Sequence, residues 1–89
     1  MYQVKLTARA RRGLDKTGGE DAERITGALQ GLGGNPRPPG VRKLRGPIHR
    51  LRVGDWRIIY AVFDKDRLVL VGRITQRSED TYDRVKDLF

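Results

Sequence analysis

Apolar and polar residues alternate at the start of the chain and in its second half, with two stretches of helical spacing between. Residues 1–6 place Tyr2, Val4 and Leu6 against polar neighbours, which predicts a half-buried strand. Residues 8–16 and 20–32 show helical spacing, and a Thr-Gly-Gly sequence at 17–19 separates them. We therefore expect a helical hairpin after the first strand.

Capping residues indicate where these helices should begin and end. Thr7 is a suitable N-cap for the first helix. Gly33 and Gly34 stand where the second helix should end, at a position that favours positive φ. Gly27 and Gly31 lie inside that helix, where each should cost about 1 kcal/mol relative to alanine unless close packing requires a glycine.

A connector rich in proline and glycine, residues 35–40, leads into the second half of the chain. There we expect strands at 41–44, 48–53, 56–63 and 68–75, and a helix at 78–88 that Ser78 caps. The order is strand, two helices, four strands and helix. This order predicts one α+β domain over residues 1–89, with helices against one face of an antiparallel β-meander.

The pair of strands at 48–53 and 56–63 predicts a hairpin with arginines in both strands. Gly54 and Asp55 supply its turn. Strand parity puts Arg50 and Arg52 on one face, while Arg57 shares its face with alternate residues of the next strand. Arg73 and Arg77 share a parity on the last strand. The pattern leaves open how these faces are paired.

The distribution of charge along the chain suggests an anionic partner. The chain carries a formal charge of +8, and residues 35–57 hold seven basic side chains against the single acid Asp55. Residues 78–89 instead contain four acids and two bases. A basic middle indicates either a docking surface for an anion or a solvated face that keeps the protein in solution.

Other chemistries find little support in the sequence. There is no cysteine, so no disulfide or thiolate site is possible, and we expect no metal and no cofactor. The longest apolar run is far too short to span a membrane, so we expect a cytoplasmic protein. Asp64 and Asp66 are interpreted as turn residues. Trp56 is interpreted as a core residue, with base stacking as the alternative.

Clustered arginines suit phosphate chemistry, because a guanidinium can bind two phosphate oxygens at once and stabilise developing negative charge. His49 is the candidate general base by residue type, although its parity points it away from Arg50. Tyr82 could stack on a base or donate its hydroxyl, and a core role is equally compatible with the pattern.

These residues carry a resemblance to a known family. The run from Lys43 to Gly46, the run from His49 to Tyr60, and Arg77 with Tyr82 resemble the RelE/ParE toxin superfamily of bacterial toxin–antitoxin modules, and most of all its RelE branch. The likeness covers nearly the whole chain. It implies a β-α-α-β-β-β-β-α fold and a ribosome-dependent endoribonuclease that cleaves messenger RNA in the ribosomal A site. The chemistry it implies is a metal-free attack of the 2′-hydroxyl on the adjacent phosphate.

The resemblance also assigns residues. It implies catalytic roles for five of them, namely Arg50, Arg52, Arg57, Arg77 and Tyr82, and RNA-binding roles for Lys43, Arg45, His49 and Arg73. The best-known RelE toxins carry lysines where Arg50 and Arg52 stand here. Because arginine does not give up its proton, these arginines would supply charge while His49, water or the ribosome accepts the proton.

The implied partners are an antitoxin with an acidic or amphipathic segment and messenger RNA on the ribosome. Operator DNA would be contacted only through the antitoxin, and no membrane is involved. Two alternatives stay open from the sequence: a ParE-like inhibitor of DNA gyrase without nuclease activity, and a basic nucleic-acid-binding module.

Overall fold

The computed structural model describes residues 1–76 of the 89-residue chain, so the helix expected at 78–88 lies outside the described residues. Five strands form one sheet: β1 (Gln3–Leu6), β2 (Arg42–Arg45), β3 (Ile48–Val53), β4 (Trp56–Phe63) and β5 (Leu68–Gln76). Two helices, α1 (Ala8–Lys16) and α2 (Gly19–Gly34), follow β1. The α+β fold and the element order expected for these residues are confirmed.

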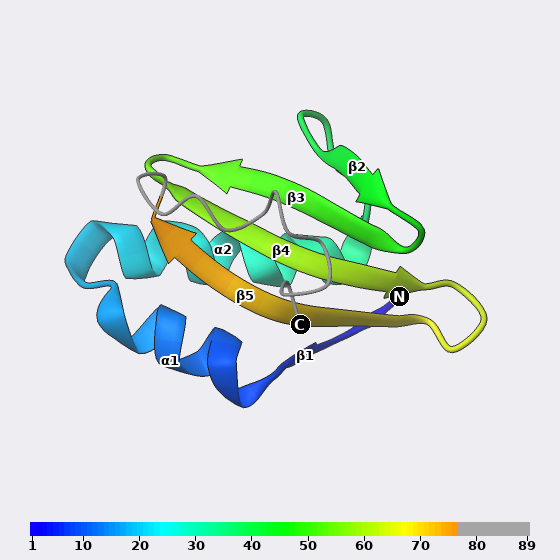
Figure 1. Cartoon of the computed structure of the whole chain (residues 1–89), viewed down its shortest axis with the longest axis horizontal. Helices are drawn as coiled ribbons and strands as arrows, with labels where there is room; N and C mark the ends of the chain where they lie inside the picture. The colour runs from blue at the N-terminus through cyan, green and yellow to red at the C-terminus, as the bar shows by residue number, and fades with distance from the viewer. Residues whose placement is uncertain (77–89) are drawn as a thin grey trace.

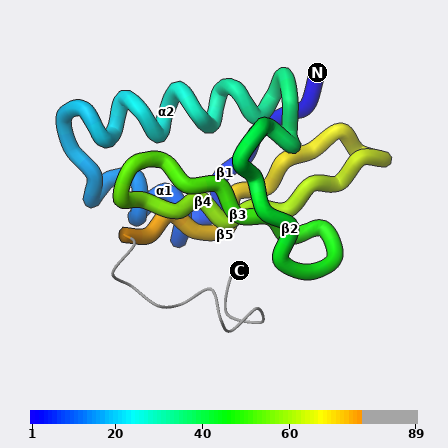
Figure 2. Tube along the Cα trace, turned by 90° about the horizontal axis from the view of Figure 1, so that it is seen from above, coloured from blue at the N-terminus to red at the C-terminus, as the bar shows by residue number. Residues whose placement is uncertain are grey.

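The sheet is mixed, with strand order β1-β5-β4-β3-β2. Strands β2 to β5 form the expected antiparallel meander, and β1 joins its far side in parallel with β5, pairing Leu6 with Val71 at its last position. α2 lies on one side of the sheet, and α1 lies along the β5 edge, from which Ala10 and Leu14 reach the same core (Figures 1 and 2). A right-handed return through the helices is the usual way to bring two parallel strands into one sheet.

The core lies between the helices and this side of the sheet. Alternate residues of β4, from Trp56 to Val62, pack with Val69, Val71 and Ile74 of β5 and with buried residues of both helices. Trp56 is buried, as expected, and its indole nitrogen donates to Asp21 of α2 at 3.2 Å. We call the opposite side of the sheet the arginine face, for residues given below. Neither described helix covers it.

Local signals predicted α1 well. It spans the expected residues, and the Thr7 side chain accepts a hydrogen bond from the amide of Ala10 at 3.1 Å. Alanine and arginine favour the helical state, and the cap satisfies an amide that the helix itself leaves without a partner. No helix within residues 1–76 is both long and apolar enough to cross a lipid bilayer.

The end of α2 was predicted wrongly. The helix continues through Gly33 and Gly34, neither has positive φ, and Asn35 is the C-cap. Gly33 is needed for packing instead, since a Cβ there would lie 3.1 Å from the carbonyl oxygen of Tyr2, whose amide donates to Gly33 at 2.8 Å. A close approach to β1 therefore explains a glycine that the sequence pattern presented as a stop signal.

Candidate nucleic-acid interface

The β3–β4 hairpin brings two arginines directly opposite each other. Gly54 has a φ of +60° and opens the two-residue loop between Val53 and Trp56, as in a type II′ turn. This register makes Arg52 the cross-strand partner of Arg57. The Cβ atoms of such partners lie about 5 Å apart on the same side of the sheet. The hairpin thus concentrates two guanidinium groups next to one turn.

Arg50 and Arg73 join this pair through Ile59. Arg50 is the partner of Ile59 on one side, and Arg73 is its partner on the other. The register of β4 and β5 shifts between Ile59 and Tyr60, where Gly72 is an extra residue on β5. A one-residue shift moves every later side chain to the other face. The bulge therefore turns Arg73 to the arginine face, while Val71 on the other side of the bulge faces the core.

The structure adds residues to this face that the sequence analysis did not single out. Arg42 is the cross-strand partner of Arg50, and Thr75 is the partner of Arg57. The register also assigns Arg45 to this side, beyond a bulge after Lys43. Pairing across the tight connection between β2 and β3 could have suggested Arg42, but the bulge obscures it. The arginine face is thus formed by six arginines and a threonine: Arg42, Arg45, Arg50, Arg52, Arg57, Arg73 and Thr75.

Burial distinguishes these side chains. Arg50 and Arg57 are each only 7% exposed, whereas Arg52 is exposed and Arg73 is half-buried. A buried guanidinium is held in a narrower range of orientations than an exposed one. Arg52 and Arg57 carry like charges directly opposite each other, an arrangement that is unfavourable in a sheet. Such a local conflict is typical of a functional site rather than of a surface selected for stability.

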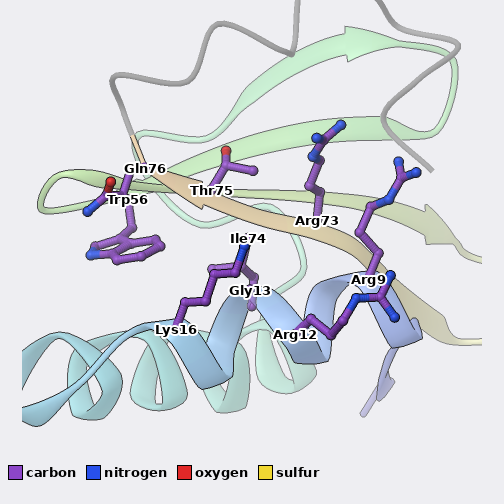
Figure 3. Close-up of a pocket in the computed structure, with 9 residues that line it drawn as sticks. All are labelled: Arg9, Arg12, Gly13, Lys16, Trp56, Arg73, Ile74, Thr75 and Gln76. Atoms are coloured by element: carbon purple, nitrogen blue, oxygen red, sulfur yellow. The ribbon is translucent and has the colours of Figure 1, made fainter.

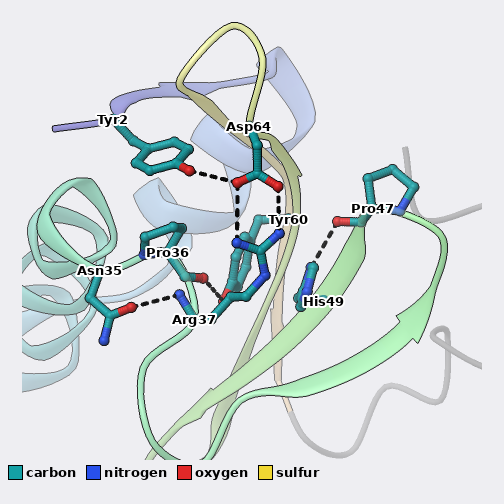
Figure 4. A network of polar contacts seen from close by, with 8 residues as sticks. All are labelled: Tyr2, Asn35, Pro36, Arg37, Pro47, His49, Tyr60 and Asp64. Carbon is teal, nitrogen blue, oxygen red and sulfur yellow. Dashed lines mark hydrogen bonds and ion pairs between the residues drawn. The ribbon is translucent and has the colours of Figure 1, made fainter.

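His49 lies on the other face of the sheet. Its partner is the core residue Tyr60, the two rings stack with centroids 5.6 Å apart, and its Nδ1 lies 2.7 Å from the carbonyl oxygen of Pro47 (Figure 4). Burial lowers the pKa of His49, with smaller opposing and reinforcing effects from Pro47 and nearby cations. Lys43 pairs with His49 and so lies on this side as well. The structure therefore brings neither residue to the arginines, as parity indicated for His49.

Asp64 proves to be more than a turn residue. It accepts hydrogen bonds from the Tyr2 hydroxyl at 2.5 Å and from both terminal nitrogens of Arg37, at 3.2 and 2.9 Å (Figure 4). The bonds from Arg37 and Tyr2 lower the pKa of Asp64 to about 2. This cluster, with the Tyr60 hydroxyl that donates to Pro36 at 2.8 Å, ties the 35–40 connector to the sheet. It lies just beyond the end of β4, at the opposite end of that strand from Arg57.

Arg77 and Tyr82, the remaining two expected catalytic residues, lie outside the described residues. Within residues 1–76, no three histidine, aspartate or glutamate side chains lie close enough to share a metal ion. What the described part of the chain brings together is a surface of guanidinium groups, which can bind phosphate oxygens and stabilise negative charge that develops on them.

Comparison with known proteins decides the family. The model of the ParE toxin of the type II toxin–antitoxin system parDE matches residues 4–81 of this chain. The chain belongs to the RelE/ParE superfamily of type II toxins. Sequence comparison with curated proteins gives no match.

Solved structures place this toxin near RelE proteins. The RelE–RelB complex from Pyrococcus horikoshii OT3 is similar with a TM-score of 0.80 and 27% identity over 88% of this chain and 97% of the other. The RelBE toxin–antitoxin complex of E. coli gives 0.73 and 25% identity over 89% of this chain and 100% of the other. The isolated E. coli RelE toxin, at 22% identity and a TM-score of 0.77, shows the same fold over the full length of both chains. The toxin is therefore RelE-like.

Proposed function

We propose that this RelE-like toxin is a ribosome-dependent endoribonuclease that cleaves messenger RNA and so inhibits translation. The observation that carries the proposal is the pair of buried arginines, Arg50 and Arg57, beside Arg52 on the β3–β4 hairpin. A site on strands holds its groups more precisely than one on loops, as transition-state stabilisation requires. A basic face that only binds nucleic acid has no need to bury its cations.

In the proposed reaction, the 2′-oxygen of a ribose bonds to the adjacent phosphorus and the bond from phosphorus to the 5′-oxygen breaks. The 5′-oxygen takes up a proton from water, so the products are a 5′-hydroxyl and a cyclic phosphate, which water can hydrolyse to the 3′-phosphate. The pentacoordinate transition state carries extra negative charge on the phosphate oxygens, which guanidinium groups at fixed positions stabilise.

The group that accepts the proton of the 2′-hydroxyl must lie outside the arginine face. Arginine stays protonated at every physiological pH and cannot act as a general base. His49 lies on the core side of the sheet, so it cannot reach a phosphate bound on the opposite side in this arrangement. In our proposal, Arg50, Arg52 and Arg57 contribute charge stabilisation together with Arg77, Tyr82 stacks on a base or donates its hydroxyl, and water or a ribosomal group accepts the 2′-proton.

The partners follow from the same proposal. Messenger RNA in the A site of a cytoplasmic ribosome is the substrate. Two of the similar structures are complexes of RelE with RelB, which supports a cognate antitoxin for this chain as well. An acidic or amphipathic antitoxin segment would complement the charge of the arginine face, and operator DNA would be contacted only through the antitoxin.

The test is primer extension on a translated reporter message after brief induction of the toxin, beside Arg57→Ala. One donor to a transition state is worth about 2.7–4 kcal/mol, so cleavage should fall by roughly 100- to 1,000-fold. Arg11→Ala is the matched control, because it removes the same charge from an exposed position on α1. Arg57→Lys keeps the charge but lacks the planar guanidinium that can donate two parallel hydrogen bonds. A loss of cleavage close to that of Arg57→Ala would show that this geometry, and not the charge alone, is required.

The match to the ParE model favours a second candidate, an inhibitor of DNA gyrase without nuclease activity. In that case the message stays intact while growth stops, and induced cells accumulate DNA breaks. Intact message in the presence of a toxic wild-type protein would therefore refute the nuclease and support this candidate.

A further inference from the structure

A cavity of about 250 Å³ lies between α1 and the last residues of β5. Its lining includes Arg9, Arg12 and Lys16 from α1, Arg73 from β5, and Trp56 from β4 (Figure 3). None of the functional assignments above uses the three α1 residues. The cavity adjoins the β3–β4 hairpin at Trp56, and it shares Arg73 and Thr75 with the arginine face.

The fold builds this cavity where β1 stops. β1 covers the edge of β5 only as far as Val71, and Thr7 then turns the chain by donating through its amide to Val71 at 2.9 Å and through its hydroxyl to Gly72 at 3.0 Å. α1 takes over beside the rest of β5. Gly13 approaches so closely that a Cβ there would lie 2.2 Å from the carbonyl oxygen of Ile74. This approach fixes the distance between the helix and the strand at the floor of the cavity.

Helical spacing puts the three α1 cations on this side. Residues 9, 12 and 16 are three and four positions apart, so they line one face of the helix over a rise of about 10 Å. Four of the lining residues are therefore cationic, and no carboxylate is found among the described residues that line the cavity. In Figure 3, Arg9 and Arg73 point toward the same side of the sheet, so the basic surface continues from the arginine face around the β5 edge to Lys16.

We propose that this cavity is a second phosphate-binding site, which holds the backbone of the same RNA strand that the arginine face contacts. The inference rests on the proposed function for the identity of the ligand. A continuous series of cations from Arg57 through Arg73 to Arg12 and Lys16 matches a strand that carries one negative charge at every nucleotide. Trp56 is not a base-stacking platform there, because it is only 7% exposed and its nitrogen bonds to Asp21. The cavity therefore recognises phosphate and not base sequence.

The test measures binding of a fluorescent single-stranded 2′-O-methyl oligoribonucleotide, which has no free 2′-hydroxyl for the proposed attack. The cavity variant is Arg12→Gln with Lys16→Gln, and the control is Arg11→Gln with Lys65→Gln. All four residues are exposed, and each double variant lowers the charge from +8 by two. Arg11 and Lys65 do not line the cavity. Far-UV circular dichroism checks that each variant folds.

Each lost phosphate contact on a single strand removes about 0.7 from the slope of log K against log salt. We expect the slope of the cavity variant to fall by about 1.4 between about 50 and 200 mM salt, with about 25-fold weaker binding near 0.1 M. The control should stay within about twofold of wild type, since neither Arg11 nor Lys65 lines the cavity and salt screens exposed charges that do not contact the strand. Exchanging the two cations, Arg12→Lys with Lys16→Arg, should keep most of the slope.

Three results would overturn the inference: no salt-dependent RNA binding by the wild type, an unchanged slope in the cavity variant, or equal losses in both double variants. A cavity variant that loses affinity for a polyaspartate peptide but not for RNA would assign the cavity to an acidic protein and also overturn it. Loss of RNA binding in the cavity variant with an uncut reporter message would support the phosphate site while the nuclease proposal failed.

Discussion

Two glycines of the helices should respond to alanine in opposite directions. Gly13 of α1 and Gly27 of α2 both lie within helices, where alanine is favoured over glycine by about 1 kcal/mol. The sequence alone gives both the same expectation. The structure separates them, because the Cβ of an alanine would meet the backbone of β5 at position 13 and nothing within 4 Å at position 27.

The contact at position 13 decides the sign there. A Cβ at 2.2 Å from the carbonyl oxygen of Ile74, and at 3.1 Å from its carbonyl carbon, cannot be relieved by a side-chain rotation, because the obstacle is backbone. Overpacking of this kind typically costs about 1–3 kcal/mol, and the strand and helix must separate to admit the methyl group. Because the obstacle is backbone, we place the cost at the upper end of this range, and we expect Gly13→Ala to lower the free energy of unfolding by about 2 kcal/mol after a gain of about 1 kcal/mol in helix propensity is subtracted.

Gly27→Ala should raise the free energy of unfolding by about 1 kcal/mol, equivalent to about 4–8 °C in Tm for a domain of this size. Gly31 is equally open and is expected to behave in the same way. Urea denaturation followed by circular dichroism measures all three variants at one protein concentration. A Gly13→Ala protein as stable as wild type would refute the close α1–β5 approach, and a destabilised Gly27→Ala protein would refute the open outer face of α2.

Three further predictions concern single side chains. Arg52→Thr removes a like charge opposite Arg57, so it should raise the free energy of unfolding by less than about 1 kcal/mol while reporter cleavage falls. A less stable variant would contradict the pairing. The pKa of Asp64 is lowered from 3.8 to about 2, so its contribution to stability is complete above about pH 4 and is lost as the pH falls toward 2. Asp64→Asn should reduce the dependence of the free energy of unfolding on pH over that range. An unchanged profile would argue against the bonds to Arg37 and Tyr2. Burial lowers the pKa of His49 below its unfolded value of 6.5, so stability is lost as the pH falls below that value. His49→Gln should remove this dependence in urea titrations at several pH values and leave the reporter cleavage sites unchanged. Loss of cleavage with intact folding would instead indicate that His49 belongs to the catalytic site.

Local signals predicted a large part of the fold. The bounds of α1 follow from Thr7 as a cap and from the break at residues 17–19, and those of β3 and β4 follow from alternation on either side of a Gly-Asp turn. Each of these depends on neighbours a few residues apart, so the information is present in a short window of sequence. The prediction that Arg50 and Arg52 share a face also needed only the two-residue period of a strand.

The candidate site could be predicted only in part. Arg57 was identified from the pattern, but its position opposite Arg52 required the register of the hairpin. Arg42 and Thr75 were missed because neither stands out in a sequence with many basic residues. Arg12 and Lys16 belonged, in sequence, to an ordinary helix surface, and only the approach of α1 to β5 makes them part of a cavity.

For residues 1–76 the sequence by itself determined the type and order of the elements, and it also determined the concentration of charge in the middle of the chain and the residue types available for phosphate binding. Only the tertiary structure decided where those residues face. The bulge at Gly72 turns Arg73 away from the core. The pairing of β1 with β5 stops where Leu6 meets Val71, and α1 lies beside β5 from there on. Register and bulges depend on contacts between residues far apart in the chain, whose energies no local pattern contains.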